Sequence, residues 1–267
     1  MRLGVNVPNF GPGTDPGMLR EWAGVVEGLG FDLLMMSDHV VITPEVAERY
    51  PEPFYEPFTT LSFLAGITTR VRLGTTVLVL PYRHPLLVAR MATNLDQLSR
   101  GRLVLGVGVG WSRQEFDALG VPFAERGRLT DEYLSTLRDA WREESGVPIW
   151  VGGNSKAAIR RAIGFGHVWH PLRGTVAWLR SALADHPRLA FAPRIALRLT
   201  TEPVEDGERL AGVGTIEQII DDLEQLRSLG ADTVLLDPYH GDPEQTRRPH
   251  AAWQALTAVA THWRTAS

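Results

Sequence analysis

Short apolar runs alternate with segments of helical periodicity along the whole chain. The first run, residues 3–8, precedes residues 17–28, in which apolar side chains recur every three or four positions. This alternation predicts eight strands, over residues 3–8, 31–36, 71–80, 102–107, 148–151, 166–169, 193–200 and 233–236. It also predicts helices over residues 17–28, 57–69, 85–98, 112–119, 131–144, 155–164, 175–184, 216–229 and 243–261.

Regular alternation of strands and helices is typical of a parallel sheet covered by helices. Eight such units in 267 residues match one α/β (β/α)8 TIM barrel, which usually needs about 250 residues. An open, doubly wound sheet is the alternative. No linker or change of composition divides the chain, so we expect a single domain over residues 1–267. The loop at residues 38–55 is long, and loops of that length are usually functional or mobile.

Polar and glycine residues follow the predicted strands, and in a TIM barrel the carboxyl ends of all strands meet on the rim that carries the chemistry. Ser37, Asp38 and His39 follow the second strand. His39 is a candidate proton donor or acceptor because imidazole titrates near neutral pH, although a single histidine is often only structural. The other candidates at strand ends are Asn6, Thr75, Thr76, Val77, Arg83, Gly108, Val109, Gly110, Trp111, Gly152, Gly153, Asn154, Ser155 and Trp169.

Two glycine segments have different meanings. Gly106, Gly108 and Gly110 continue a strand and do not open a helix, which excludes the dinucleotide fingerprint. They are either small residues at a bulge or bare backbone for the close approach of a flat ring.

The segment from Gly152 to Ser155 lies between a strand and a helix, where free N–H groups can bind an anion such as phosphate. An ordinary tight turn is the alternative reading. Residues 211–215 are a second candidate for the anion site, because barrel phosphate sites often follow the seventh and eighth strands.

Composition excludes several classes. The net charge of −4 gives no basic surface for nucleic acid, and the absence of cysteine excludes thiolate chemistry and disulfides. The histidines show no metal-ligand spacing, so no metal is expected and a metal-dependent hydrolase is disfavoured. No G-x-S-x-G motif is present. No membrane span or signal peptide is apparent, so we expect a cytoplasmic protein that does not bind membranes.

Taken in order, these strand ends resemble the luciferase-like flavin and deazaflavin oxidoreductases, and most closely the members that depend on coenzyme F420. The similarity covers residues 1–170 well and the rest only by pattern. It rests on residues 30–32 and 37–39, 70–77, 84–85 and 89–90, 101–108, 115–116, 120, 126–128 and 148–155.

The resemblance implies a (β/α)8 barrel that binds F420, or alternatively FMN, at its carboxyl rim. It implies a bulge in the third strand with a cis peptide bond at Thr76–Val77 behind the ring, a phosphate loop at Gly152, Gly153 and Asn154, and His39 near the reactive face.

Two departures from the family pattern matter. The usual insertion before the fifth strand is shortened, because residue 141 is followed closely by Pro148. Trp111 stands where deazaflavin sugar-phosphate dehydrogenases carry a glutamate, which argues against that substrate class.

The leading hypothesis is hydride transfer between F420 and a small organic substrate. His39 would handle the proton, and Asp38 would orient His39 or contact the cofactor. Asn6, Arg83, Trp111 and Trp169 would contact substrate. An FMN-dependent monooxygenase with a separate flavin reductase, and a non-catalytic flavin-binding barrel, are the alternatives. A homodimer is expected, with the last helix either forming the interface or closing the barrel.

Overall fold

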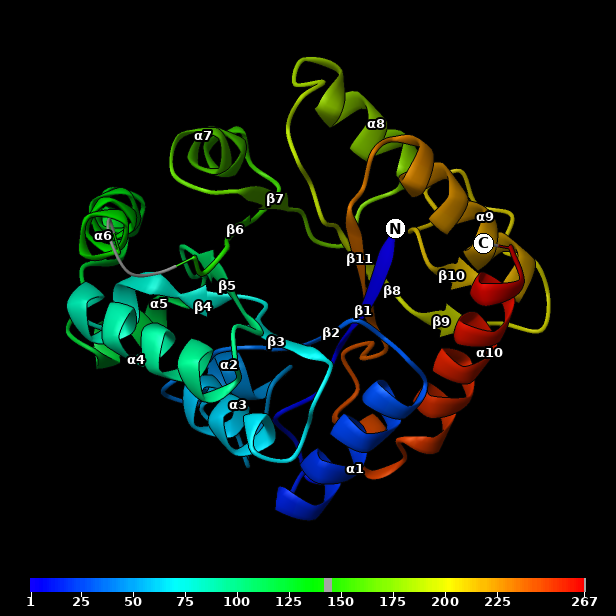
Figure 1. Ribbon diagram of the computed structural model, residues 1–267, viewed down its shortest axis with the longest axis horizontal. Coiled ribbons are helices and arrows are strands. Elements are labelled where there is room, and N and C mark those ends of the chain that lie inside the picture. The colour runs from blue at the N-terminus through cyan, green and yellow to red at the C-terminus, as the bar shows by residue number, and fades with distance from the viewer. Residues whose placement is uncertain (142–145, 267) are drawn as a thin grey trace.

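The computed structural model describes residues 1–141 and 146–266. Parallel strands form the wall of a barrel, and helices pack around its outside (Figure 1). The wall strands are β1 (Arg2–Asn6), β2 (Leu33–Met36), β3 (Arg72–Thr75), β4 (Leu78–Val79), β5 (Leu103–Gly108), β6 (Ile149–Gly152), β7 (Val168–His170), β8 (Arg194–Ala196) and β11 (Thr233–Asp237). The helices are α1 (Pro16–Gly28), α2 (Pro44–Ala47), α3 (Pro57–Ala65), α4 (Pro85–Leu98), α5 (Arg113–Ala118), α6 (Arg126–Ala140), α7 (Lys156–Gly164), α8 (Val176–Ala184), α9 (Ile216–Ser228) and α10 (His250–Ala266).

The strand order confirms the expected (β/α)8 TIM barrel. The strands are hydrogen-bonded in the order β7-β6-β5-β3-β2-β1-β11-β8, with β4 beside β5. Parallel bridges between Trp169 and Phe191 and between Leu172 and Arg194 close the ring between β7 and β8. The helix α6 ends shortly before β6, the fifth barrel strand, as the shortened insertion requires. Residues 142–145 of this connection lie outside the described residues.

The core has two parts because alternate strand residues point to opposite faces. In β2, Leu33 and Met35 point into the barrel, whereas Leu34 and Met36 face the helices. The barrel interior is filled by Leu33, Met35, Val104, Trp150, Ala192 and Leu235. Since both faces of β2 are covered, all four of its residues are buried, which explains its continuous apolar sequence.

Four elements differ from the sequence-based expectation. The third strand is interrupted at the cis Thr76–Val77 bond, which the resemblance predicted, and the Thr75 hydroxyl donates to the Gly106 carbonyl there. The expected seventh strand divides at Leu197. Beyond it β9 (Arg198–Leu199) leaves the barrel to pair with β10 (Val213–Gly214).

Among the helices, α6 begins at Arg126, ahead of the expected residue 131. The expected last helix is split into a 3-10 turn, η3 (Pro243–Arg247), and α10, which starts after Pro249. The short 3-10 turns η1 (Leu80–Tyr82) and η2 (Phe123–Glu125) complete the elements.

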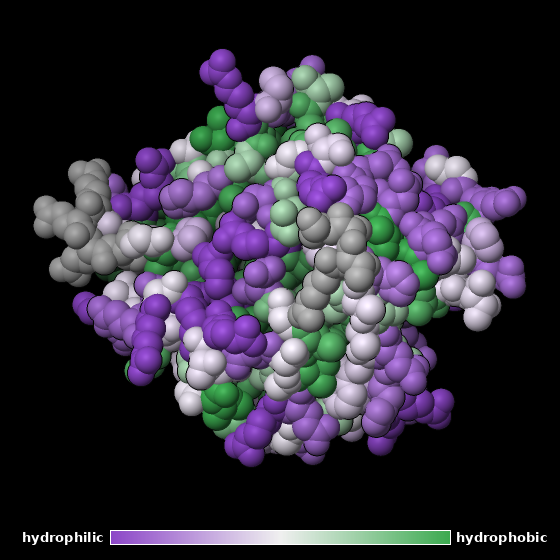
Figure 2. Space-filling model, turned by 45° about the vertical axis from the view of Figure 1, so that its right-hand side comes forward, coloured by the Kyte–Doolittle hydropathy of each residue, from purple (hydrophilic) through white to green (hydrophobic). Residues whose placement is uncertain are grey.

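The last helix closes the barrel. Trp253 of α10 packs edge-on against Trp22 of α1 with ring centroids 5.6 Å apart, and Trp263 is buried against the core. These tryptophans are therefore used inside the chain, which favours the closing role over an interface. On the face shown in Figure 2, hydrophilic side chains predominate and hydrophobic atoms show between them in separate patches. Within the described residues, no helix has the length and apolarity needed to cross a membrane.

Close backbone contact between β3 and β5 provides a test of the barrel packing. A Cβ at Gly106 would lie 2.0 Å from the Thr75 carbonyl oxygen, so Gly106→Ala should lower the free energy of unfolding by about 1–3 kcal/mol. Gly24 of α1 has no atom within 4 Å of such a Cβ, so Gly24→Ala should raise it by about 0.5–1 kcal/mol. Urea unfolding measures both; equal stability of Gly106→Ala and the parent would contradict the packing.

Candidate active site

A cavity of about 240 Å³ opens at the carboxyl ends of the barrel strands. One side is lined by residues that follow β2 and β3, namely Asp38, His39, Thr76 and Val77. The other side is lined by residues at the ends of β5 and β6, namely Gly108, Val109, Gly110, Trp111, Gly152 and Gly153. The structure thus brings together ten of the candidates named from the sequence.

The six other candidates do not line this cavity. Thr75 is fully buried behind it, and the side chains of Asn154 and Ser155 are engaged with backbone groups near α7.

The Val77 side chain packs directly against two glycines. A Cβ at Gly108 would lie 2.5 Å from Val77 Cγ2, and a Cβ at Gly152 would lie 2.6 Å from Val77 Cγ1. Neither position can carry a larger side chain without moving Val77. Val77, Gly108 and Gly152 therefore form one continuous wall on neighbouring strands, and its low relief suits the face of a flat ring.

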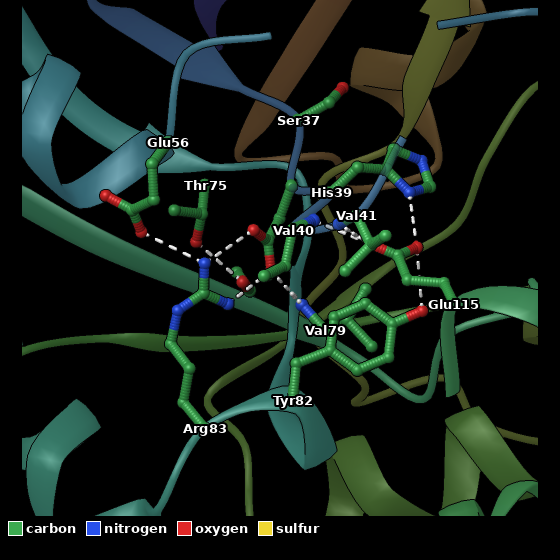
Figure 3. Close-up of polar contacts among 12 residues, drawn as sticks. Ser37, His39, Val40, Val41, Glu56, Thr75, Val79, Tyr82, Arg83 and Glu115 are labelled. Atoms are coloured by element: carbon green, nitrogen blue, oxygen red, sulfur yellow. Dashed lines mark hydrogen bonds and ion pairs between the residues drawn. The ribbon is translucent and has the colours of Figure 1, made fainter. Parts of the chain in front are cut away.

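The His39 ring is held by a buried carboxylate (Figure 3). His39 Nδ1 lies 2.8 Å from Glu115 Oε2, and both side chains are buried. The Tyr82 hydroxyl donates to the same oxygen at 2.9 Å, while the amides of Val40 and Val41 donate to Oε1. With Nδ1 directed at the carboxylate, Nε2 is the ring nitrogen left for chemistry.

These contacts keep Glu115 ionised. Burial alone would raise the pKa of Glu115, but the hydrogen bond and charge of His39, with the two backbone amides, outweigh burial and lower the pKa. Burial and the neighbouring Glu115 raise the pKa of Tyr82, so its phenol stays protonated and donates. A fixed negative charge thus faces Nδ1 of His39.

Asp38 does not orient His39, and its alternative role, contact with the cofactor, stays a prediction. Both carboxylate oxygens of Asp38 accept from Arg83, at 2.7 and 2.8 Å, and Val79 N also donates to one of them. Arg83 additionally donates to Glu56. Arg83 is therefore occupied by two carboxylates, which contradicts its expected role as a substrate contact. The cluster ties the segment after β2 to the segment after β4.

A second group of polar side chains lies on the opposite wall. The His170 Nδ1–H donates to the Ala192 carbonyl, so Nε2 accepts from the Thr76 hydroxyl at 2.9 Å. Arg194 Nη1 donates to the Thr76 carbonyl at 2.9 Å. Through these bonds β7 and β8 support the residue at which the third barrel strand is interrupted.

Asp237, at the end of β11, balances the arginines of this wall. It accepts from both Arg194 and Arg173, and the Asn6 amide donates to it at 3.0 Å. Burial would raise the pKa of Asp237, but the charges of Arg194 and Arg173 outweigh burial and lower it. The Asn6 side chain is thus bound to Asp237 and does not line the cavity, contrary to its expected role as a substrate contact.

One of the two candidate tryptophans packs in the interior, and the other lines the cavity. Trp169 is fully buried, donates its indole N–H to the Gly153 carbonyl and packs near Trp178, so its expected substrate contact is wrong. Trp111 lines the cavity with 43% of its surface exposed, and its ring meets His39 edge-on. The sequence placed both at strand ends, but β7 turns Trp169 toward the helices.

The two candidate anion loops also differ. In the second candidate, the Gly212 amide donates to Asp222 and the Thr215 amide to Gln218, so these donors are already used. At the first candidate, Gly153 N–H donates to the His170 carbonyl and Ser155 caps α7 by accepting from Ala158 N–H. The amides of the first turn of α7 that precede Ala158 have no acceptor within the helix. They remain as donors for an anion.

A family model described as luciferase-like monooxygenase matches residues 1–186. The chain belongs to the luciferase-like monooxygenase family. This membership confirms the resemblance to the family. A relative from Mycobacterium tuberculosis H37Rv, an uncharacterised protein, is 32% identical over 173 residues; the match covers 52% of this chain but only 60% of that relative.

Solved structures share the family fold. An F420-dependent secondary alcohol dehydrogenase has a TM-score of 0.72 at 16% identity, over 97% of this chain and 98% of that chain. The oxygenating constituent of 3,6-diketocamphane monooxygenase from Pseudomonas putida, solved with FMN, also has a TM-score of 0.72, at 15% identity and 97% coverage of each chain. At these identities the likeness concerns the fold alone.

Sequence reasoning missed Glu115, His170, Arg194 and Asp237. Glu115 lies 76 positions from His39, and nothing in the local sequence links the two. A usable signal existed: Glu115 stands in a family-like segment three residues after Ser112, the cap of α5, on the same rim. Asp237 ends the last barrel strand, and an acidic residue there also points to the rim.

The buried His170 predicts how the stability of this family member depends on pH. Burial lowers the pKa of His170 to about 4, aided by the charge of Arg194 and opposed by the bond to Ala192. In the unfolded chain the histidine has a pKa of about 6.5, so the unfolded state binds the extra proton first as pH falls below that value. His170 should cost about 2 kcal/mol of stability between pH 7 and pH 5.

Urea unfolding of the parent and of His170→Gln at both pH values measures this cost. The loss of stability on acidification should be about 2 kcal/mol smaller in the variant. His186→Gln, after α8, controls for the removal of a histidine. The same acid dependence in parent and His170→Gln would contradict a buried, neutral His170.

Proposed function

We propose that the chain is an F420-dependent oxidoreductase that transfers a hydride between the deazaflavin and a small organic substrate, with His39 moving the accompanying proton. The observation that carries the proposal is the pairing of His39 Nδ1 with the buried Glu115 on the wall of the rim cavity. A histidine that served only packing would not need an ionised carboxylate, two amides and a phenol around its partner. Residues 1–267 would act as one domain.

One wall of the cavity would suit a planar redox ring. Val77 packs against the backbone of Gly108 and Gly152, where a Cβ would collide with it, so the three residues would support one face of the ring. The amides in the first turn of α7, beside Gly153 and Asn154, would hold the phosphate of the cofactor through the helix dipole. When bound, such a cofactor supplies the hydride acceptor or donor that no side chain provides.

The chain itself supplies the path for the proton. Glu115 holds the Nδ1–H of His39, so Nε2 exchanges a proton with the substrate atom that gains or loses it. Asp38 and Arg83 keep the segment that carries His39 attached to η1.

The family includes FMN-dependent enzymes, so a monooxygenase supplied by a separate flavin reductase is the competing function. The cavity wall described above would accept either ring. Cofactor binding and oxygen consumption separate the two, and a non-catalytic barrel predicts binding without turnover. We also propose that the chain forms a homodimer and acts in the cytoplasm.

Titration with F420 and with FMN, followed by absorbance and protein fluorescence, tests the cofactor. We expect F420 to bind more tightly, and the reduced form to be oxidised by small ketones without oxygen. Tight binding of FMN alone, with oxygen uptake after reduction, would overturn the F420 assignment in favour of the monooxygenase.

Replacement of His39 tests the proton path. His39→Ala should retain cofactor binding and lose about 10²–10⁴-fold in kcat, the usual contribution of a positioned acid or base. His186→Ala, a histidine outside the cavity lining, should keep the parent rate. Unchanged kcat in His39→Ala would contradict the role of His39, and absence of turnover in the parent itself would favour the non-catalytic barrel.

A further inference from the structure

We propose that the rim cavity selects a neutral, largely apolar substrate, and that Trp111 is the residue that determines this specificity. The inference rests on the proposed function and names the substrate class of the same site. It predicts a ketone or alcohol whose single oxygen meets His39 and whose carbon skeleton lies against Trp111.

The first support is that every charged side chain lining the cavity already has a charged partner among the described residues. Asp38 is paired with Arg83, and His39 with Glu115. Arg194 uses Nε and Nη2 for Asp237 and Nη1 for the Thr76 carbonyl. A carboxylate or phosphate on the substrate would have to break one of these buried pairs to be neutralised. Such an exchange leaves a buried charge without its partner and is unfavourable.

The second support is the apolar character of the cavity mouth. Trp111 and Leu172 line the cavity although 43% and 42% of their surfaces are exposed, and Val40, next to His39, is 43% exposed. Single exposed apolar residues are common on protein surfaces. Trp111 and Leu172, which both line the cavity with the paired charges behind them, form a surface that a carbon skeleton would cover.

The third support is the aromatic surround of His39. Tyr50 stacks on the His39 ring at 5.1 Å between centroids, while Phe54 and Trp111 meet it edge-on at 5.5 and 5.7 Å. Phe54 and Tyr50 come from the loop after β2 and Trp111 from the segment after β5, so two separate segments enclose one ring. These rings keep water from His39. Around His39 they offer a substrate only neutral groups.

The geometry gives Trp111 a position that the other two aromatics lack. Phe10 packs against both Tyr50 and Phe54, which fixes these rings from behind. Trp111 lines the cavity and is more open to solvent than Tyr50 or Phe54. Trp111 therefore contributes to substrate binding, whereas His39 contributes to the chemical step.

Two ketones of equal shape test the charge preference. In the holoenzyme, loaded with the cofactor that it binds, 4-methylacetophenone carries a methyl group where 4-acetylbenzoate carries a carboxylate. We expect calorimetry to show the neutral ketone binding at least about tenfold more tightly. Equal or tighter binding of 4-acetylbenzoate, or no binding of the neutral ketone, would overturn the inference.

Variants of Trp111 test the residue. Trp111→Ala should raise KM for 4-methylacetophenone about tenfold and leave kcat within a few-fold, and Trp111→Phe should recover most of the loss. Leu199→Ala, an equally exposed apolar residue outside the cavity lining, is the matched control and should change neither. A parent-like KM in Trp111→Ala would overturn the role of Trp111.

Measurements of binding and of turnover distinguish failure of this inference from failure of the proposed function. If the neutral ketone binds with the expected preference and Trp111 dependence but is not reduced, the substrate class stands and the proposed hydride transfer fails. If ketones are reduced but 4-acetylbenzoate is preferred, hydride transfer stands and the inferred substrate class fails.

Discussion

The buried carboxylate of Glu115 is the constraint on which the candidate site depends. It accepts from His39, from Tyr82 and from the amides of Val40 and Val41, so one side chain of α5 fixes two segments far apart in sequence. A carboxylate removed from water is unfavourable unless its oxygens are hydrogen-bonded. Every partner is therefore required, and the positions of His39 and Tyr82 follow from that requirement.

On the opposite wall a buried positive charge is likewise balanced by its hydrogen-bond partners. Arg194 is buried and would be unfavourable alone, but Asp237 balances it and Asn6 donates to the same carboxylate. Arg194 also supports the Thr76 carbonyl, and neutral His170 accepts from the Thr76 hydroxyl. Removal of one partner from such buried pairs typically costs about 3–5 kcal/mol, so we infer that each wall behaves as a unit. The cavity lies between the two walls.

The barrel could be predicted from the sequence because the patterns that indicate its strands and helices are local. Continuous apolar runs such as β2 and amphipathic helices such as α1 are visible within a few residues. The carboxyl rim followed from topology, which placed His39, Gly108 and Gly152 together correctly. The partners of those residues could not be predicted in this way. Glu115 and Asp237 act across the barrel, and which side chain reaches His39 depends on the three-dimensional distance between the ends of β2 and β5. The same limit explains why the sequence suggested Asp38, adjacent to His39, as a residue that could orient it.

The most direct test of the central claim is the tautomer of His39 in solution. In ¹⁵N-histidine-labelled protein, a long-range ¹H–¹⁵N correlation spectrum assigned by comparison with His39→Gln should show His39 carrying its proton on Nδ1. In Glu115→Gln, with the protein still folded, that signal should change to a mixture of tautomers. A parent His39 protonated on Nε2 alone, or a spectrum that Glu115→Gln leaves unaltered, would contradict the account.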